Sequence, residues 1–345
     1  MRIFNLDLHI SVIADIKYII NKLYPNDEIS ITNWSISGHN WVFNLPNENI
    51  EIINQSTWKN INKEMINKFC ERYDDFLKTF DAFIVTHTPV FCLIFERYNK
   101  PIILINSCRY EQPYSWKNDL VNWNYLSHKL YHLFYKKLLI PVSNNLADKE
   151  YLKLGCNIDS IYIPSLCLYT NLTYKNLYRF LVYDLNNYIP RHNNFVNRYR
   201  IRKYDFDDMR KYRAIIHIPY EASTMSIFEQ YNMNIPLFFP SKTLLKELIK
   251  TNKIQFNSRY AKNIFPESLT STLGTNWIDF WIDHADYYND NMPHITYFNN
   301  TVELFELLYN SNYDDITIKM AEFNKIKNEK VYNQWKSIIN DIKTK

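Results

Sequence analysis

Two glutamates near the middle of the chain, Glu221 and Glu229, have the spacing of two carboxylates carried by one helix. Seven residues separate them. Eight steps of about 100° come to roughly 80° beyond two full turns, so one carboxylate can lie at a helix start and the other two turns along. Ser223 and Thr224 between them suit a phosphate at a helix N-terminus, although they are also ordinary N-cap residues. The spacing fits a ligand site, although a pair of glutamates on a plain surface helix is the more common alternative when the spacing is taken alone.

The elements around these glutamates predict how they are positioned. Residues 214–218 form a short apolar run before Pro219, typical of a buried strand, and 221–231 have helical spacing. A second apolar run, 236–239, completes the order strand, turn, helix, strand, which is the repeating unit of a parallel sheet covered by helices. Ligands of such sheets lie beyond the carboxyl ends of the strands. We therefore expect the site at 219–224, which includes Tyr220.

The stretch 213–241 resembles the donor-binding segment of GT-B glycosyltransferases, in which a Glu, seven residues and a Glu precede an apolar segment with a Pro. The resemblance implies that Glu229 binds the ribose hydroxyls of a nucleotide sugar and that Glu221 lies near the sugar or the phosphates. The residues expected around this donor are Pro219, Tyr220, Ser223 and Thr224. The family usually has Gly near the first Glu, and this chain has none there, which leaves the phosphate contacts open.

A second stretch, 141–165, resembles the last unit of the N-terminal domain in the same family: a strand ending in Ser, a capped helix closed by Gly155, and a strand ending at Pro164. The alternative is one more helix and strand of any doubly wound domain. Three shorter motifs, 7–17, 35–41 and 163–170, are similar to glycosyltransferase-like proteins of large DNA viruses of algae and amoebae. That resemblance implies a viral protein acting in the host cytoplasm.

Length and composition limit the classes of protein. A chain of 345 residues predicts two domains, and only 3 Gly exclude both G-x-G-x-x-G and P-loop sites. The net charge of +4 is close to balanced, so nucleic acid is not an expected partner. Five scattered cysteines suggest free thiols in a reducing compartment, and no run of 18 uncharged apolar residues predicts a membrane span. A cytoplasmic protein is expected.

Alternating strand and helix patterns predict an α/β protein with two Rossmann-like parallel-sheet domains that face a cleft, as the GT-B resemblance implies. We expect an acceptor domain at 1–168, a nucleotide-sugar domain at 169–325, and a C-terminal helix at 326–345 that packs back on the first domain. Within the first domain, 58–80 is predicted to be one long helix capped by Ser56 or Thr57.

Candidate catalytic residues follow the first predicted strand. His9 is the expected base, because a GT-B subgroup resembling plant natural-product enzymes uses a His there with a carboxylate partner; Asp7 and Asp15 are the candidates for that partner. The alternative is that His9 only caps a strand end. Weaker acceptor candidates lie on adjacent loops: His39, His87, Arg109 and Glu111. Arg109 and Glu111 could instead be an ordinary ion pair.

The leaving diphosphate needs positive or hydrogen-bonding groups. Arg179, Arg213 and Lys242 are the basic candidates, and the sequence does not rank them. No metal or other cofactor is expected, because GT-B enzymes generally do without a bound metal. The pair Asp205 and Asp207 resembles the Asp-x-Asp of GT-A enzymes but lacks the strand context.

The expected function is transfer of a hexosyl or pentosyl group from a UDP- or GDP-linked donor, UDP favoured, to a glycan or another hydroxyl acceptor. Two alternatives stay open: a catalytically inactive module that binds a glycan or protein, and a sugar-nucleotide epimerase. The spacing of Glu221 and Glu229 leans toward retention of configuration and His9 toward inversion. The oligomeric state is left open.

Overall fold

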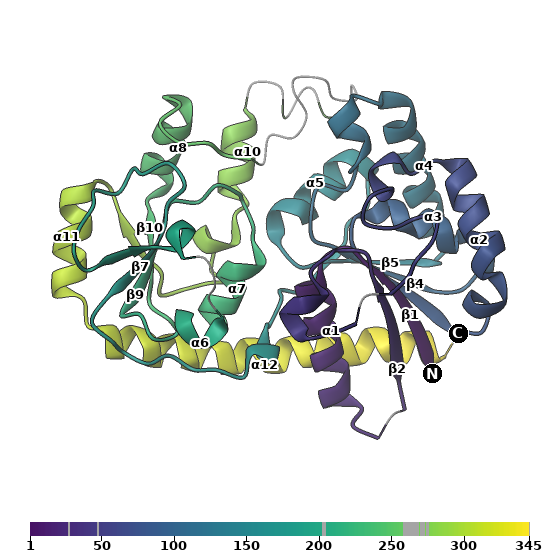
Figure 1. Ribbon diagram of the computed structural model, residues 1–345, viewed down its shortest axis with the longest axis horizontal. Helices are drawn as coiled ribbons and strands as arrows, with labels where there is room; N and C mark the ends of the chain where they lie inside the picture. Colours follow the sequence, from purple (N-terminus) through teal and green to yellow (C-terminus); the bar gives the residue numbers. More distant parts are fainter. Residues whose placement is uncertain are drawn as a thin grey trace. The chain divides into compact units, whose positions relative to one another are not determined.

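The computed structural model describes residues 1–26, 28–46, 48–201, 205–257, 269, 273 and 276–344. Contacts divide the chain into two compact units. Unit 1 contains Met1–Ser165 and Val331–Lys345, and unit 2 contains Leu166–Arg259 and Thr275–Lys330. Each unit has its own parallel sheet with helices around it, so the predicted fold class of two Rossmann-like parallel-sheet domains is confirmed (Figure 1).

Unit 1 is built on a six-stranded sheet with the order β2-β1-β3-β4-β5-β6, and every neighbouring pair is parallel. The central strands are almost continuously apolar and are buried, because helices cover a sheet of this kind. The strands are β1 (Arg2–Asp7), β2 (Ser30–Ser35), β3 (Ala82–His87), β4 (Ile102–Asn106), β5 (Leu139–Ser143) and β6 (Ile161–Tyr162).

The helices of unit 1 mostly follow the strands as the sequence predicts. They are α1 (Ile10–Leu23), α2 (Lys63–Leu77), α3 (Cys92–Phe95), α4 (Leu120–Tyr135) and α5 (Leu146–Cys156), with short 3-10 turns η1 (Asn40–Phe43), η2 (Trp58–Asn60), η3 (Pro89–Phe91), η4 (Glu96–Tyr98) and η5 (Tyr114–Lys117). The long helix predicted for 58–80 was wrong at its start. Asn62 caps α2 by accepting a 3.0 Å hydrogen bond from the Met65 N–H, so neither Ser56 nor Thr57 is the cap.

Gly155 does not close α5, as the sequence suggested, but lies inside it. Asn157 ends the helix in the left-handed region at φ 53°. The side chain of Tyr110 packs directly over Gly155: a Cβ there would lie 2.2 Å from the Tyr110 hydroxyl oxygen. The glycine is therefore required by a close approach and not by a turn.

Unit 2 is built on a five-stranded parallel sheet with the order β11-β10-β9-β7-β8. Its strands are β7 (Phe180–Tyr183), β8 (Phe195–Asn197), β9 (Ala214–His217), β10 (Leu237–Pro240) and β11 (Thr296–Phe298). Its helices are α6 (Phe206–Met209), α7 (Met225–Asn232), α8 (Lys242–Lys250), α10 (Trp277–Asp283) and α11 (Thr301–Asn310), with turns η6 (Leu168–Thr170), η7 (Arg198–Arg200) and η8 (Asp286–Tyr288).

The helix expected at 221–231 begins only at Met225, after Thr224 in the N-cap position. Glu221 therefore lies in the turn between β9 and α7, whereas Glu229 is on the helix. The Tyr287 hydroxyl donates a 3.0 Å hydrogen bond to the Glu221 carbonyl oxygen, which holds this turn in a non-helical conformation.

The last helix, α12 (Tyr313–Lys343), contributes to both units and is drawn in yellow in Figure 1. In unit 2, Asn324 Nδ2 donates to the Tyr231 carbonyl oxygen at 3.0 Å. In unit 1, Gln334 Nε2 donates to the Tyr162 carbonyl oxygen at 3.2 Å, and Lys343 pairs with Glu28 at 3.2 Å. The predicted helix that returns to the first domain is thus present.

In each sheet the two strands that come next after the first strand in the chain lie on opposite sides of it. In unit 1 the chain passes from β1 to β2 on one side and then to β3 on the other; in unit 2 it does the same from β7 to β8 and then to β9. Ligands of open parallel sheets bind beyond the carboxyl ends of the strands at such a switch point. The residues that follow β1 and β3, and those that follow β7 and β9, are therefore the places to look for a site.

Replacing Gly155 by Ala is expected to destabilise the protein, although Ala favours a helix interior by about 1 kcal/mol. The new Cβ would meet Tyr110, which is fully buried and accepts a 2.8 Å hydrogen bond from Trp123 Nε1. We expect a loss of about 1–3 kcal/mol in the free energy of unfolding, measured by urea denaturation. Lys153→Ala, at an exposed position of the same helix, is the control. A Gly155→Ala protein as stable as the wild type would contradict the close packing.

Candidate functional site

Asp7 ends β1 and ties three neighbouring strands together. Its buried carboxylate accepts hydrogen bonds from the His9 N–H at 2.8 Å, the Ser35 hydroxyl at 2.8 Å and the Thr86 hydroxyl at 2.9 Å. Burial raises the pKa of Asp7 to about 6, although all three donors lower it. Asp7 therefore holds the backbone of His9. The sequence suggested instead that this carboxylate would be the partner of the His9 imidazole.

His9 sits at the N-cap of α1, but its side chain forms no capping hydrogen bond. The ring stacks on His87, with 5.9 Å between centroids, and the buried Nδ1 has no hydrogen-bond partner among the described residues. Burial lowers the pKa of His9 to about 4, and the charge of His39 acts in the same direction. The imidazole is therefore neutral at pH 7.

The other carboxylate considered for His9, Asp15, is buried on α1. Burial raises the pKa of Tyr332 in α12, and the charges of Tyr18 and then Asp15 add smaller contributions, so Asp15 lies near Tyr332. His39 is exposed at the start of η1, close enough to influence His9. Of these side chains, the structure therefore brings His9, His39 and His87 together, with Asp7 beneath His9 as an anchor.

His87 ends β3 with a φ of 76°, a left-handed conformation that is uncommon and strained for a residue with a Cβ. The Cys108 Sγ lies 3.4 Å from His87 Nδ1 and 3.2 Å from the His87 carbonyl oxygen. Burial lowers the pKa of His87 to about 3, and the charges of His9 and Arg109 lower it further. Strained backbone conformations of this kind concentrate at functional sites, which favours a role for the histidine pair.

Arg109 and Glu111 do not form the ion pair considered from the sequence. The Arg109 guanidinium pairs with Asp148 at 3.6 Å, and both side chains are buried. Asp148 is held in turn by Asn145, the N-cap of α5, whose Nδ2 donates at 2.9 Å. Glu111 is buried, and burial raises its pKa to about 7 against smaller opposing effects of neighbours such as Arg109.

Unit 2 has a small pocket at the carboxyl ends of β7 and β9. Four of the residues that line it are candidates from the sequence: Pro219, Tyr220, Glu221 and Thr224. The other lining residues were not predicted: Tyr183, His217, Ile218, Ser226 and Ile227. Neither Ser223 nor Glu229 lines it. Thr224 Oγ1 and Ser226 Oγ lie 3.1 Å apart at the start of α7, where backbone N–H groups also favour an anion.

Glu229 is buried in the second turn of α7, with 6% of its surface exposed. Its Oε1 accepts a hydrogen bond from the Tyr169 hydroxyl of η6. Glu221 is equally buried, and it faces Tyr287, whose pKa is raised first by burial and then by the Glu221 charge. Neither glutamate lies on a solvated surface helix, so the plain alternative for the pair is wrong.

His217 is a site residue that sequence reasoning missed. It ends β9 and is stacked between Tyr183, at 4.8 Å and 24°, and Phe239, at 4.7 Å and 17°. Its Nε2 lies 2.6 Å from Gln230 Oε1, and burial lowers its pKa to about 4. Because Gln230 Oε1 can only accept, Nε2 carries the proton and Nδ1 does not. The available signal was a polar residue at the last position of an apolar strand, two residues before Pro219.

The structure ranks the three basic candidates for a diphosphate. Arg179 and Arg213 immediately precede β7 and β9, so they lie at the amino ends of the strands, at the opposite edge from the pocket. Arg213 places its guanidinium 4.7 Å from the Tyr313 ring. Lys242 follows β10 and starts α8, at the carboxyl edge, where it lies 4.0 Å from Asp283. Only Lys242 is at the expected edge.

Asp205 and Asp207 have structural partners. Asp205 is the N-cap of α6 in a capping box with Asp208, and Asp207 pairs with Arg210 and Lys211. Within the parts of the chain that the structure describes, no group of three or more His, Cys, Asp or Glu side chains could hold a metal ion. The described helices include none that is both long and apolar enough to cross a bilayer.

Comparison with known proteins gives structural likenesses only. No protein-family model matches the chain, and no curated protein matches it in sequence. It is similar to the glycosyltransferase SnogD from Streptomyces nogalater, with 8% identity, 96% of this chain and 98% of that one covered, and a TM-score of 0.46. It is also similar to the spinosyn rhamnosyltransferase SpnG complexed with thymidine diphosphate, with 8% identity, coverage of 94% and 96%, and a TM-score of 0.44.

A third similar structure is a putative UDP-N-acetylglucosamine 2-epimerase from Listeria monocytogenes, with 12% identity, 84% of this chain and 92% of that one covered, and a TM-score of 0.45. Because these TM-scores are below 0.5, function has to be argued from the residues of this chain. What its own fold and site define is a two-domain α/β protein with ionisable clusters at the carboxyl edges of both sheets.

The raised pKa of Glu111 predicts that the free energy of unfolding falls as the pH rises. Its folded-state pKa of about 7 exceeds the ordinary 4.5, so the folded state binds the proton more tightly than the unfolded state. Stability is therefore lost as pH rises between about 4.5 and 7, by on the order of 3 kcal/mol. Glu111→Gln should remove this fall, seen as a smaller change in the free energy of urea unfolding between pH 5 and pH 8.

Asp7 adds a smaller loss over a lower range, between its ordinary 3.8 and its raised pKa of about 6. The exposed Glu48→Gln is the control and should leave the pH dependence of stability unchanged. If Glu111→Gln keeps the wild-type slope between pH 6 and 8, the buried carboxyl is not the group responsible.

Proposed function

We propose that this protein is a nucleotide-sugar-dependent glycosyltransferase that moves a hexosyl or pentosyl group from a UDP- or GDP-linked donor to a hydroxyl of a glycan or another acceptor. The observation that carries the proposal is the pocket at the carboxyl ends of β7 and β9, where Glu221, Thr224 and Ser226 gather at the start of α7. The pocket itself is small, with a volume of about 10 Å³, but its polar groups lie at a helix N-terminus and a sheet switch point, a place that suits the phosphates of a nucleotide diphosphate.

In this proposal the donor is held by unit 2. The diphosphate takes the N–H groups of the first turn of α7 and the hydroxyls of Thr224 and Ser226, and Lys242 contributes positive charge from the start of α8. Glu229 lies further along α7 and does not line the pocket; it binds the ribose hydroxyls after releasing the Tyr169 hydroxyl, whose hydrogen bond it accepts in the structure. Glu221 receives hydrogen bonds from the transferred sugar. No metal or other cofactor is part of the proposal.

The acceptor is held by unit 1, beside the histidine pair. The acceptor hydroxyl donates its proton to the imidazole of neutral His9, the acceptor oxygen forms the new bond to the anomeric carbon, and the bond from that carbon to the phosphate oxygen breaks with its electron pair leaving on the nucleotide. The desolvated His9 is a weak base, which requires that the hydroxyl be well oriented. Direct attack of this kind inverts the configuration at the anomeric carbon.

The donor site is tested by thermal shift with UDP, GDP and TDP and with their glucose or mannose conjugates. A ligand present at about 100 times its dissociation constant stabilises the folded state by about 2.7 kcal/mol, so at least one compound should raise the melting temperature clearly. Glu229→Ala should abolish that response, whereas Glu306→Ala on the exposed side of α11 should retain it. No response to any compound, or an unchanged response in Glu229→Ala, would count against the proposal.

Transfer is tested by following the sugar from the responding donor onto acceptor oligosaccharides. His9→Ala should lower kcat by about 10²–10⁴ while the thermal response to the donor stays unchanged, because His9 is in unit 1 and acts on the acceptor. His128→Ala, an exposed histidine of α4, is the matched control. Retention of configuration together with full activity of His9→Ala would exclude His9 as the base.

The same assay separates the two alternatives to transfer. An epimerase interconverts the free nucleotide sugars with no acceptor present, and an inactive binding module gives a thermal response without any turnover.

A further inference from the structure

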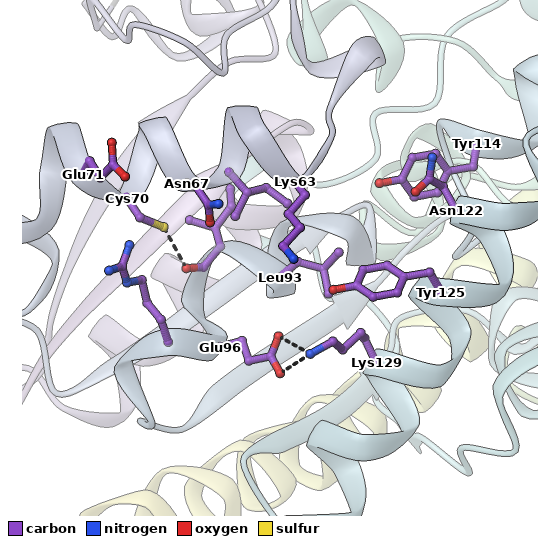
Figure 2. A pocket seen from close by; sticks show the side chains of 13 residues that line it. Lys63, Asn67, Cys70, Glu71, Leu93, Glu96, Tyr114, Asn122, Tyr125 and Lys129 are labelled. Carbon is purple, nitrogen blue, oxygen red and sulfur yellow. Dashed lines mark hydrogen bonds and ion pairs between the residues drawn. The ribbon is translucent and has the colours of Figure 1, made fainter.

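Unit 1 has a cavity on its helical face, separate from the pocket described in unit 2. This helix groove lies between α2, the α3–η4 segment and α4, and has a volume of about 480 Å³ (Figure 2). None of the residues that line it belongs to the histidine pair or to the pocket of unit 2. Ligand pockets commonly have volumes of about 300–1,000 Å³, so the helix groove has the size for a small molecule or one or two sugar rings.

The floor of the helix groove is closed by a contact between α2 and α3. The Cys70 thiol donates a 3.3 Å hydrogen bond to the Ile94 carbonyl oxygen, and Cys70, Leu93 and Ile94 are all buried. Figure 2 shows this hydrogen bond as a dashed line from the Cys70 sulfur. Buried groups therefore fix the floor of the groove, and the polar and charged side chains that could contact a ligand lie on its walls.

One wall carries a pre-organised ion pair. Lys129 Nζ lies 2.8 Å and 3.1 Å from the two carboxylate oxygens of Glu96, and both side chains are about 30% exposed: 27% for Lys129 and 30% for Glu96. The two groups fix each other's orientation, yet each keeps part of its surface toward the groove. A donor and an acceptor are thus presented side by side at a known spacing.

Aromatic and amide groups also line the groove, and Tyr125 neighbours the ion pair, with Lys129 Nζ 5.8 Å from its ring centroid. Tyr125 projects from α4 toward the centre of the helix groove in Figure 2 and is 43% exposed, which is unusual for a large ring at a cavity. Asn67 lines the groove from α2, and Asn122 lines it from α4 with its amide oriented by Asp119 at 2.7 Å. An aromatic face suits the C–H face of a sugar ring, while amides both donate to and accept from hydroxyls.

The charges around the helix groove nearly cancel. Three cations, Lys63, Arg97 and Lys129, face two carboxylates, Glu71 and Glu96. A strongly anionic ligand such as a nucleotide or nucleic acid would meet the carboxylates of Glu71 and Glu96, whereas an uncharged polyol can use every group as a donor or acceptor.

We propose that the helix groove binds an uncharged sugar unit of a glycan. Tyr125 stacks on the ring, the pair of Lys129 and Glu96 binds adjacent hydroxyls, and Asn67 and Lys63 complete the wall. Binding here involves no bond making or breaking. It does not depend on the proposed transfer reaction, because the groove shares no residue with the donor pocket or with His9.

The test measures binding of maltotriose, cellotriose and N-acetyllactosamine to the full chain by isothermal titration calorimetry, without any nucleotide. At least one should bind, and Tyr125→Ala should weaken that binding by about tenfold or more, the loss expected when an aromatic contact is removed. Tyr135→Ala, which removes a 76% exposed tyrosine of the same helix outside the groove, should leave the affinity unchanged. Glu229→Ala should also leave it unchanged.

Three results would overturn the proposal: no binding of any of the three oligosaccharides, equal affinity in Tyr125→Ala and wild type, or loss of binding in Glu229→Ala. The last result would place the sugar in unit 2. To guard against misfolding, Asn67→Ala at an exposed position of α2 provides a second groove variant and should also weaken binding. Failure of the nucleotide response described above would leave this outcome untouched, so the two proposals fail separately.

Discussion

The arrangement of this protein depends on one constraint: every strand pair in both sheets is parallel. Parallel strands place all their carboxyl ends at one edge, so residues that are far apart in the chain meet there. Asp7, Thr86 and Ser35 come from three different strands and are joined at that edge by hydrogen bonds to one carboxylate. In unit 2 the same constraint brings Tyr183 and His217 into register and into a stack.

Burial then determines the protonation states at both edges. His9, His87 and His217 all have lowered pKa values, and in each case loss of water around the ring is the largest cause. Asp7 and Glu111 have raised pKa values for the same reason. The sites therefore present neutral imidazoles and partly protonated carboxyls at pH 7. Groups of this kind can exchange protons with a hydroxyl without first losing a strong ion pair.

Much of the architecture could be predicted from the sequence because apolar periodicity reports burial directly. The strands, the two-domain organisation and the final helix follow from it, and so does the turn between β9 and α7. The residue that caps a helix and the role of a single glycine were less predictable. Asn62 rather than Ser56 caps α2, and Gly155 serves a close contact with Tyr110 that no local pattern reveals. Both depend on which groups the rest of unit 1 brings near.

The candidate site, too, was predictable in part. The amino-acid pattern predicts which polar residues end or follow buried strands, since a run of apolar residues next to His9, His87 or Glu221 can be read directly along the chain. The partners of these residues became clear from the folded chain: Asp7 with the His9 backbone, Arg109 with Asp148, and Glu229 with Tyr169. The tertiary structure also placed Arg179 and Arg213 at the amino ends of β7 and β9 and brought His217 into the pocket. The physical reason is that strand direction and hydrogen-bond geometry are properties of assembled sheets, whereas sequence patterns record only which side chains avoid water.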